Sequence, residues 1–85
     1  MNETVENRIK RLRMRSMRRG IKEMDLILDA FAERNLEAMD ASALDLYDAL
    51  LLENDQDLYQ WVTGQVPAPG RFQSLIAEIS QTFQK

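Results

Sequence analysis

The segment RRGIKEMD, residues 18–25, ends a basic stretch and begins the first stretch with a strong apolar face. It contains Gly20, which is the only glycine before Gly64. Gly20 fits the position after a helix, where a positive φ costs glycine little, and it fits equally the N-cap of the next helix. In the second case Glu23 has the capping-box position and reaches back to the Gly20 amide. The segment therefore predicts a junction between two helices.

On the N-terminal side of the junction, Val5, Ile9 and Leu12 recur at helical spacing. Acidic residues near the start of this stretch, and Arg18 and Arg19 at its end, suit the dipole of a helix. We expect a helix over residues 4–18. Its apolar stripe is narrow, and arginine occupies most of its other faces.

The chain after the junction contains four more amphipathic stretches separated by turn residues. We expect helices over residues 21–34, 41–52, 55–63 and 71–83. Asp40 is a good N-cap for the third helix, Asn54 or Asp55 caps the fourth, and Gly64 ends the fourth. No strand-like alternation or repeat is visible in the sequence. The pattern predicts a single domain over residues 1–85, an all-α compact bundle of five short helices.

The composition excludes several kinds of functional site in this chain. The 85 residues include no cysteine and no histidine, which removes disulfides, thiolate metal sites, the usual zinc ligand and the usual general base. The sequence has no G-x-G-x-x-G and no Walker loop. We therefore expect a protein that is not an enzyme and has no metal site. No apolar run is long enough for a bilayer, so we expect a cytoplasmic protein without membrane insertion.

Charge is distributed unevenly along the chain, although the net charge is only −3. Eight lysines and arginines and no acid lie between Arg8 and Lys22, whereas only Arg71 and Lys85 are basic from Asn35 onward. The basic run is compatible with a solvated face, with an acidic protein partner or with nucleic acid. The overall acidity and the lack of aromatic residues in the run disfavour nucleic acid. A small helical nucleic-acid-binding or regulatory module that uses the first helix is the alternative function.

The junction itself allows two interpretations. In the structural one, Gly20 makes the turn while Glu23 caps the next helix or pairs with Arg19. In the functional one, a glycine at an exposed corner lets another backbone approach closely, and Arg19 and Glu23 beside it offer a forked donor and an acceptor.

Several blocks in order resemble one family. The blocks are RGIKEMDL (residues 19–26), LDLYD (44–48), LLE (51–53), DLYQW (57–61) and PAP (67–69). Together they resemble the signature of the succinate dehydrogenase flavinylation factors, the SdhE-type assembly factors, over roughly residues 8–84. The resemblance implies a small five-helix bundle that binds the flavoprotein subunit of succinate dehydrogenase and, in some bacteria, that of fumarate reductase. It also implies that the protein promotes covalent attachment of FAD to a histidine of that subunit.

The Arg-Gly-x-x-Glu motif is the functional surface that this resemblance implies. By position it consists of Arg19, Gly20 and Glu23, with Asp25 and Arg18 as further candidates. We expect Arg19→Ala to weaken partner binding with little change in melting temperature. Gly20 replaced by a bulky residue is expected to abolish flavinylation while the bundle stays folded.

The residues limit how such a factor can act. A chain without histidine cannot be the histidyl acceptor of flavin, and without a dinucleotide loop we expect no tight FAD binding by this chain. FAD is then carried by the partner subunit, and the protein acts as a binding chaperone that positions it. We expect a monomer. Mitochondrial members need a presequence, and because this chain starts almost directly at the domain we expect a bacterial cytoplasmic protein.

Overall fold

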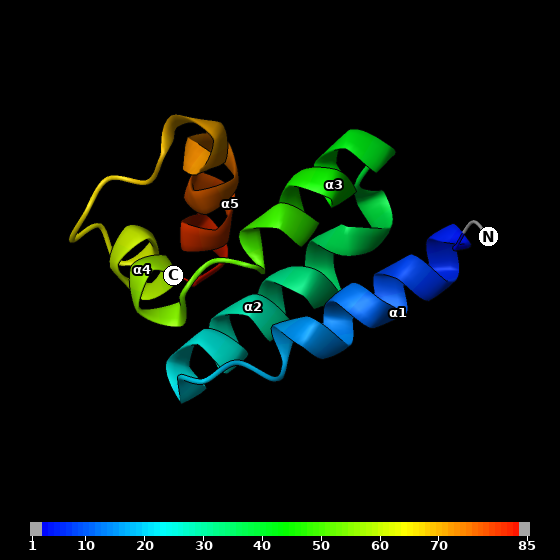
Figure 1. Cartoon of the computed structure of the whole chain (residues 1–85), viewed down its shortest axis with the longest axis horizontal. Coiled ribbons are helices and arrows are strands. Elements are labelled where there is room, and N and C mark those ends of the chain that lie inside the picture. The colour runs from blue at the N-terminus through cyan, green and yellow to red at the C-terminus, as the bar shows by residue number, and fades with distance from the viewer. Residues whose placement is uncertain (1–2, 84–85) are drawn as a thin grey trace.

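The computed structural model describes residues 3–83, and this part of the chain is helical without any strand (Figure 1). The elements are α1 (Val5–Ser16), α2 (Lys22–Asn35), the 3-10 turn η1 (Leu36–Ala38), α3 (Ala41–Leu50), α4 (Asp55–Val62), the 3-10 turn η2 (Gly70–Phe72) and α5 (Gln73–Phe83). The predicted all-α bundle of five short helices is confirmed. Within residues 3–83, no helix combines the length and the apolar character needed to cross a membrane.

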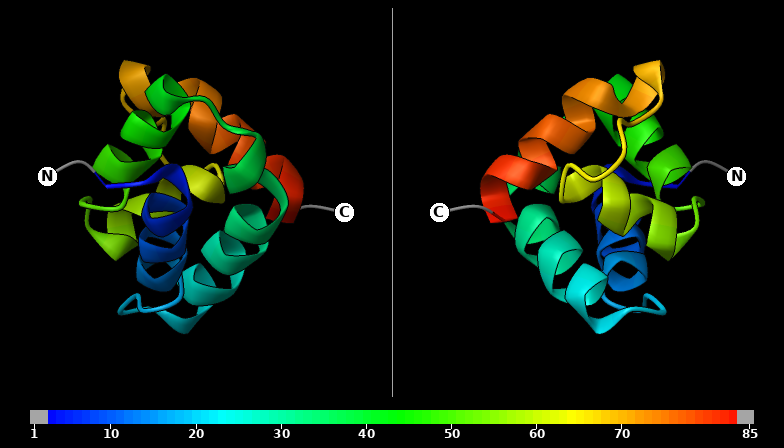
Figure 2. Two further views of the ribbon diagram at one scale, coloured as in Figure 1. Left: turned by 90° about the vertical axis from the view of Figure 1, so that its right-hand side faces the viewer. Right: turned by 90° about the vertical axis from the view of Figure 1, so that its left-hand side faces the viewer.

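Helix α2 lies at the centre of the bundle and packs against α1, α4 and α5. Its buried side chains Met24, Ile27, Leu28 and Phe31 follow helical spacing and form one continuous face. Figure 2 shows α1 and α2 as the arms of a V joined at their connecting segment, with α3 and α5 across its open side. The core therefore lies between α2 and the helices around it.

The core also contains one polar contact. The Tyr47 hydroxyl lies 2.6 Å from Ser16 Oγ, and Ser16 Oγ donates to the Leu12 carbonyl at 2.8 Å. Since the single Ser16 proton is used on Leu12, Tyr47 is the donor to Ser16. Burial raises the pKa of Tyr47 to about 12, so its hydroxyl keeps its proton at neutral pH. This buried contact joins the end of α1 to α3.

Three of the predicted helix caps are present. Asp40 accepts a hydrogen bond from the Ala43 amide at 2.8 Å, and the Asn54 side chain accepts from the Gln56 amide at 2.7 Å. The sequence left Asn54 and Asp55 open as caps, and the structure places Asn54 there. Gly64 has a φ of +80° and follows Thr63, the C-cap of α4, as expected for a glycine that ends a helix.

Helix α1 ends earlier than predicted, at Ser16 rather than near residue 18. The Met17 amide still bonds to the Arg13 and Met14 carbonyls, after which the backbone leaves the helix. Arg18 and Arg19 therefore lie beyond the helix that they were expected to complete. Helix α3 likewise ends at Leu50, and the first residues of the predicted fifth helix form the turn η2 instead.

Gly20 has neither of the two roles that the sequence predicted. Among the described glycines only Gly64 has a positive φ, and the N-cap of α2 is Ile21. The residue after α1 is Met17, so three residues separate the end of that helix from Gly20. Gly20 belongs to the non-helical linker between α1 and α2, at a bend of the backbone, and the reason for a glycine there is a tertiary contact.

Replacing Ser16 with alanine tests the buried polar contact. The Tyr47 hydroxyl would lose its acceptor inside the core, and we expect a loss of about 1–3 kcal/mol in the free energy of unfolding, measured with urea. Ser74→Ala, at an exposed position, is the control and should change stability little. Adding Tyr47→Phe to Ser16→Ala should recover part of the loss. A single variant as stable as the wild type would contradict the assigned bond.

Candidate functional site

The linker between α1 and α2 lies against the loop between α3 and α4, and Arg19 connects them. Its Nη1 donates to the Leu51 carbonyl at 2.8 Å, its Nη2 to the Glu53 carbonyl at 3.1 Å, and its Nε to Asp55 Oδ1 at 2.6 Å. Only 10% of the Arg19 side chain is exposed. We call Arg19 with these three acceptors the Arg19 clamp. It uses the forked donor geometry of guanidinium to hold two connecting segments together.

The clamp provides a hydrogen-bond donor at the C-terminal end of α3. The last carbonyls of a helix have no partner inside the helix, and a basic side chain is a common partner for them. Leu51 is the residue that follows α3, and its carbonyl accepts from Arg19. Arg19 therefore caps the end of α3 from a distant part of the chain.

Two carboxylates hold the backbone of the linker. The Arg19 amide donates to Asp25 Oδ1, and the Gly20 amide donates to Asp55 Oδ2. Asp55 thus accepts the Arg19 side chain on one oxygen and the Gly20 amide on the other. Both acids lie in the first turn of their helices, where the dipole stabilises negative charge.

Glycine fits at position 20 because Asp55 approaches it closely. A Cβ at this position would lie 3.2 Å from Asp55 Oδ2, so any side chain would have to displace that carboxylate by a few tenths of an ångström. Gly20 is exposed on its other side. The linker therefore exposes the Gly20 backbone to solvent on one side, while Asp55 holds the same backbone on the side that faces the protein. We call this exposed part of the linker the Gly20 corner.

The structure separates the predicted site residues into two groups. Arg19, Gly20 and Asp25 come together at the clamp, whereas Arg18 and Glu23 are exposed. Within residues 3–83 the Glu23 side chain has no hydrogen bond or ion pair. The predicted capping box and the predicted Arg19–Glu23 pair are therefore wrong, because Asp55 accepts both donors that Glu23 was expected to accept.

The sequence interpretation missed Asp55 as a member of this site. The sequence predicts Asp55 only as a possible cap of the fourth helix. Asn54 fills the cap, which leaves the Asp55 carboxylate free for another partner. That partner lies 36 residues earlier in the chain, and no local spacing rule connects the two positions.

Most arginines of α1 face acids from neighbouring helices. Arg15 and Arg11 approach the Asp48 carboxylate of α3 at 2.7 and 3.3 Å, and Arg8 bonds to Asp45 of the same helix. Burial raises the pKa of Asp48, but the hydrogen bonds from Arg11 and Arg15 outweigh burial and leave that pKa below its ordinary value. The basic run is thus largely matched by acids of the same protein, unlike an open phosphate-binding face.

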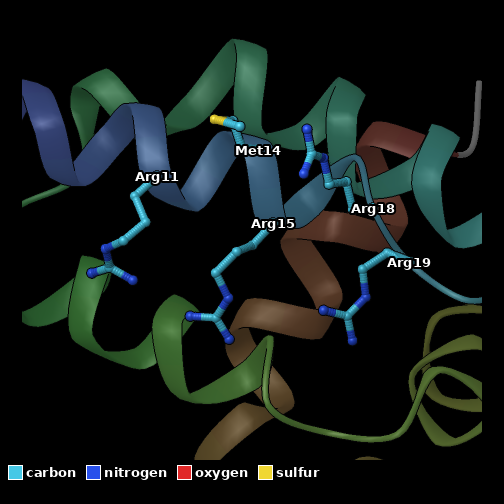
Figure 3. Close-up of a pocket in the computed structure, with 5 residues that line it drawn as sticks. All are labelled: Arg11, Met14, Arg15, Arg18 and Arg19. Atoms are coloured by element: carbon cyan, nitrogen blue, oxygen red, sulfur yellow. The ribbon is translucent and has the colours of Figure 1, made fainter.

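A groove runs along the C-terminal half of α1 and onto the linker. It encloses about 380 Å³ and is lined by Arg11, Met14, Arg15, Arg18 and Arg19. Figure 3 shows Arg11, Arg15 and Arg19 extending to the same side, toward α3 and the loop that follows it, with Met14 and Arg18 above them. Among the described residues no group of three or more acids is placed to hold a metal ion.

The fold and the site define a small all-helical protein that presents a clamped, glycine-containing corner beside an arginine-lined groove. A family model described as "Flavinator of succinate dehydrogenase" matches residues 10–83, and the chain belongs to this family. The family expected from the sequence blocks is thereby confirmed. Its members are assembly factors rather than enzymes.

Relatives in yeasts and flies carry the name "Succinate dehydrogenase assembly factor 2, mitochondrial". The protein of Candida glabrata is 43% identical over 99% of this chain and 56% of its own length. That of Meyerozyma guilliermondii is 42% identical over 98% of this chain and 62% of its own length. That of Drosophila grimshawi is 38% identical over 99% of this chain and 58% of its own length. The chain thus spans between about half and two thirds of these curated relatives.

The clamp leads to a different prediction for Arg19→Ala than the small change in melting temperature expected from the sequence. Removing either partner of a hydrogen-bonded charge pair leaves the other without its partner, so we expect Arg19→Ala and Asp55→Ala each to lower the free energy of unfolding by about 1.5–3 kcal/mol. Asp57→Ala, an exposed acid in the same first turn of α4, is the matched control and should cost less. Equal effects at Asp55 and Asp57 in urea unfolding would show that the clamp contributes no stability.

Asp48 gives a prediction about pH. Its pKa in the folded protein is lowered from 3.8, so its contribution to stability is present above about pH 4 and is lost as the pH falls through the folded value. We expect Asp48→Asn to be less stable than the wild type at pH 7 and this difference to shrink toward pH 3. Thermal unfolding at pH 7, 5 and 3 measures it. A difference that stays constant over this range would contradict the assignment.

Proposed function

We propose that this protein is an assembly factor that binds the flavoprotein subunit of succinate dehydrogenase and promotes covalent attachment of FAD to it. The match of the flavinator family over residues 10–83 is the observation that carries the proposal. The relatives' names, which refer to succinate dehydrogenase assembly, support it. The clamped corner supports it further, because a preordered backbone loses less conformational entropy when it binds a partner.

We assign the motif residues different roles in this proposal. Gly20 lets the partner's backbone approach the linker, and the exposed Glu23 and Arg18 contact the partner beside it. Arg19 and Asp25 act mainly by holding the linker in its binding shape, since their polar atoms are engaged inside the protein. All five predicted residues thus keep a part in binding, three by contact and two by positioning.

The chemistry of flavin attachment belongs to the partner in this proposal. The chain has no histidine to accept flavin and no G-x-G-x-x-G loop to bind its pyrophosphate, so it does not fit a tight FAD site of its own. FAD, when bound to the partner, supplies the reactive flavin. This chain contributes by stabilising the partner conformation in which flavin and acceptor histidine meet.

The proposal also covers the client proteins, the oligomeric state and the cellular compartment of the factor. We include the flavoprotein subunit of fumarate reductase as a second client, and we expect the factor to bind as a monomer. The relatives described above are named as mitochondrial proteins, so the bacterial cytoplasm stays a prediction for this chain.

Co-expression with the succinate dehydrogenase flavoprotein subunit tests the function. In-gel flavin fluorescence should show more covalent flavin with the wild-type factor than without any factor. Gly20→Leu should lose most of this increase because its side chain displaces Asp55 and covers the corner. Gly70→Leu is the matched control, since Gly70 is also exposed and nothing lies within 4 Å of an added Cβ.

The controls separate three outcomes of this experiment. Circular dichroism must show that the Gly20→Leu protein is folded before its activity is interpreted. Wild-type levels of covalent flavin with folded Gly20→Leu would refute the corner as the docking surface. No increase with the wild-type factor would refute the proposed function itself.

A further inference from the structure

The arginine-lined groove has more positive than negative charge around it. Four guanidinium groups line it, from Arg11, Arg15, Arg18 and Arg19. The acids that pair with them are Glu3, Asp48 and Asp55. Within residues 3–83 Arg18 forms no ion pair, and Asp48 is shared among three arginines, Arg8, Arg11 and Arg15. The groove therefore retains an attraction for a further anionic group.

The arginines keep donors free for such a group. The side chain of Arg15 is 32% exposed, and its bond to Asp48 uses Nη1. A guanidinium has five N–H donors, so the rest of the Arg15 fork can take a second carboxylate. Arg18 is exposed and adjacent to the corner formed by Gly20. The anionic ligand would thus lie between α1 and the clamped linker.

The groove also has an apolar wall. Met14 lines it with 51% of its surface exposed, and Met17, one turn further along, is 50% exposed. Exposed methionines adapt to the shape of an apolar partner side chain at little conformational cost. A ligand that combines a carboxylate with an apolar neighbour would satisfy both parts of the groove.

We propose that this groove binds an acidic segment of the client flavoprotein, with carboxylates on Arg15 and Arg18 and an apolar side chain on Met14. This inference rests on the proposed function and extends the docking surface from the Gly20 corner along α1. It adds residues outside the Arg-Gly-x-x-Glu motif, which contains neither Arg15 nor Met14.

A protein carboxylate fits the groove better than a polyphosphate does. The groove lies at the C-terminal end of α1, where the helix dipole disfavours dense negative charge. The carboxylates of Asp48 and Asp55 lie beside the same arginines and would repel a phosphate chain. Exposed methionine also offers nothing to a phosphate. The charge and the apolar wall together favour a peptide.

A matched pair of charge reversals tests the proposal. Arg18→Glu and Lys10→Glu make the same change in net charge, and both residues are exposed, but Lys10 does not line the groove. The Kd of each variant for the purified flavoprotein subunit is measured by biolayer interferometry at 50, 150 and 300 mM NaCl. We expect Arg18→Glu to weaken binding about tenfold at 50 mM NaCl and to reduce its salt dependence, with Lys10→Glu within about twofold of wild type.

A second pair tests the apolar wall. Met14→Gln should weaken binding about fivefold with unchanged salt dependence, because it removes apolar contact and no charge. Val5→Thr, also at an exposed apolar position on α1, should bind like the wild type. Melting curves for all four variants establish that the differences do not come from unfolding.

The outcomes distinguish the groove from the function. Equal weakening by Arg18→Glu and Lys10→Glu would overturn the groove in favour of general electrostatic attraction. Wild-type binding by the groove variants, with binding lost in Gly20→Leu, would overturn the groove while the proposed function stands. Pyrophosphate or duplex DNA is added as a competitor of the flavoprotein subunit. If either displaces the subunit at a concentration close to the Kd of the factor for the subunit, the groove is a phosphate site instead. A wild-type factor that does not bind the subunit at all would refute the proposed function.

Discussion

The Arg19 clamp is the interaction on which the geometry of this protein depends. One guanidinium group bonds to two carbonyls of the loop after α3 and to the first residue of α4. The same Asp55 carboxylate takes the Gly20 amide, so a single acid orders both the side chain and the backbone of the linker. Because these bonds are partly buried, leaving an acceptor unpaired carries a desolvation cost. The linker is consequently ordered although it belongs to no helix.

Folding and binding share residues at this corner. A variant of Arg19 or Asp55 loosens the linker and changes the surface offered to a partner, so lost flavinylation alone would not separate the two effects. Arg18 allows a cleaner separation, because its side chain is exposed and forms no ion pair within residues 3–83. The corner is thus a surface whose shape is maintained from inside the protein.

The uneven charge of the sequence becomes a set of contacts between helices. Arginines of α1 face Asp45 and Asp48 of α3, and Arg13 lies near Asp29 and Glu33 of α2. Exposed ion pairs of this kind contribute less than about 1 kcal/mol each, so they orient α1 more than they stabilise it. Because several arginines share the Asp48 carboxylate, the groove near Arg18 has more positive than negative charge. A net charge of −3 therefore coexists with a basic surface at one edge.

The sequence by itself determined the helices, the caps at Asp40 and Gly64, and the family, because periodicity, cap chemistry and ordered motif blocks are local signals. Only the tertiary structure decided that the Arg19 side chain is mostly buried, that Gly20 lies in the linker rather than at a helix end, and that Asp55 joins them. Arg19 and Asp55 are 36 residues apart, and their pairing depends on how α1 and α4 pack on α2. A local sequence pattern indicates which residues can form a hydrogen bond or ion pair, but the packing of the helices determines which of them become partners.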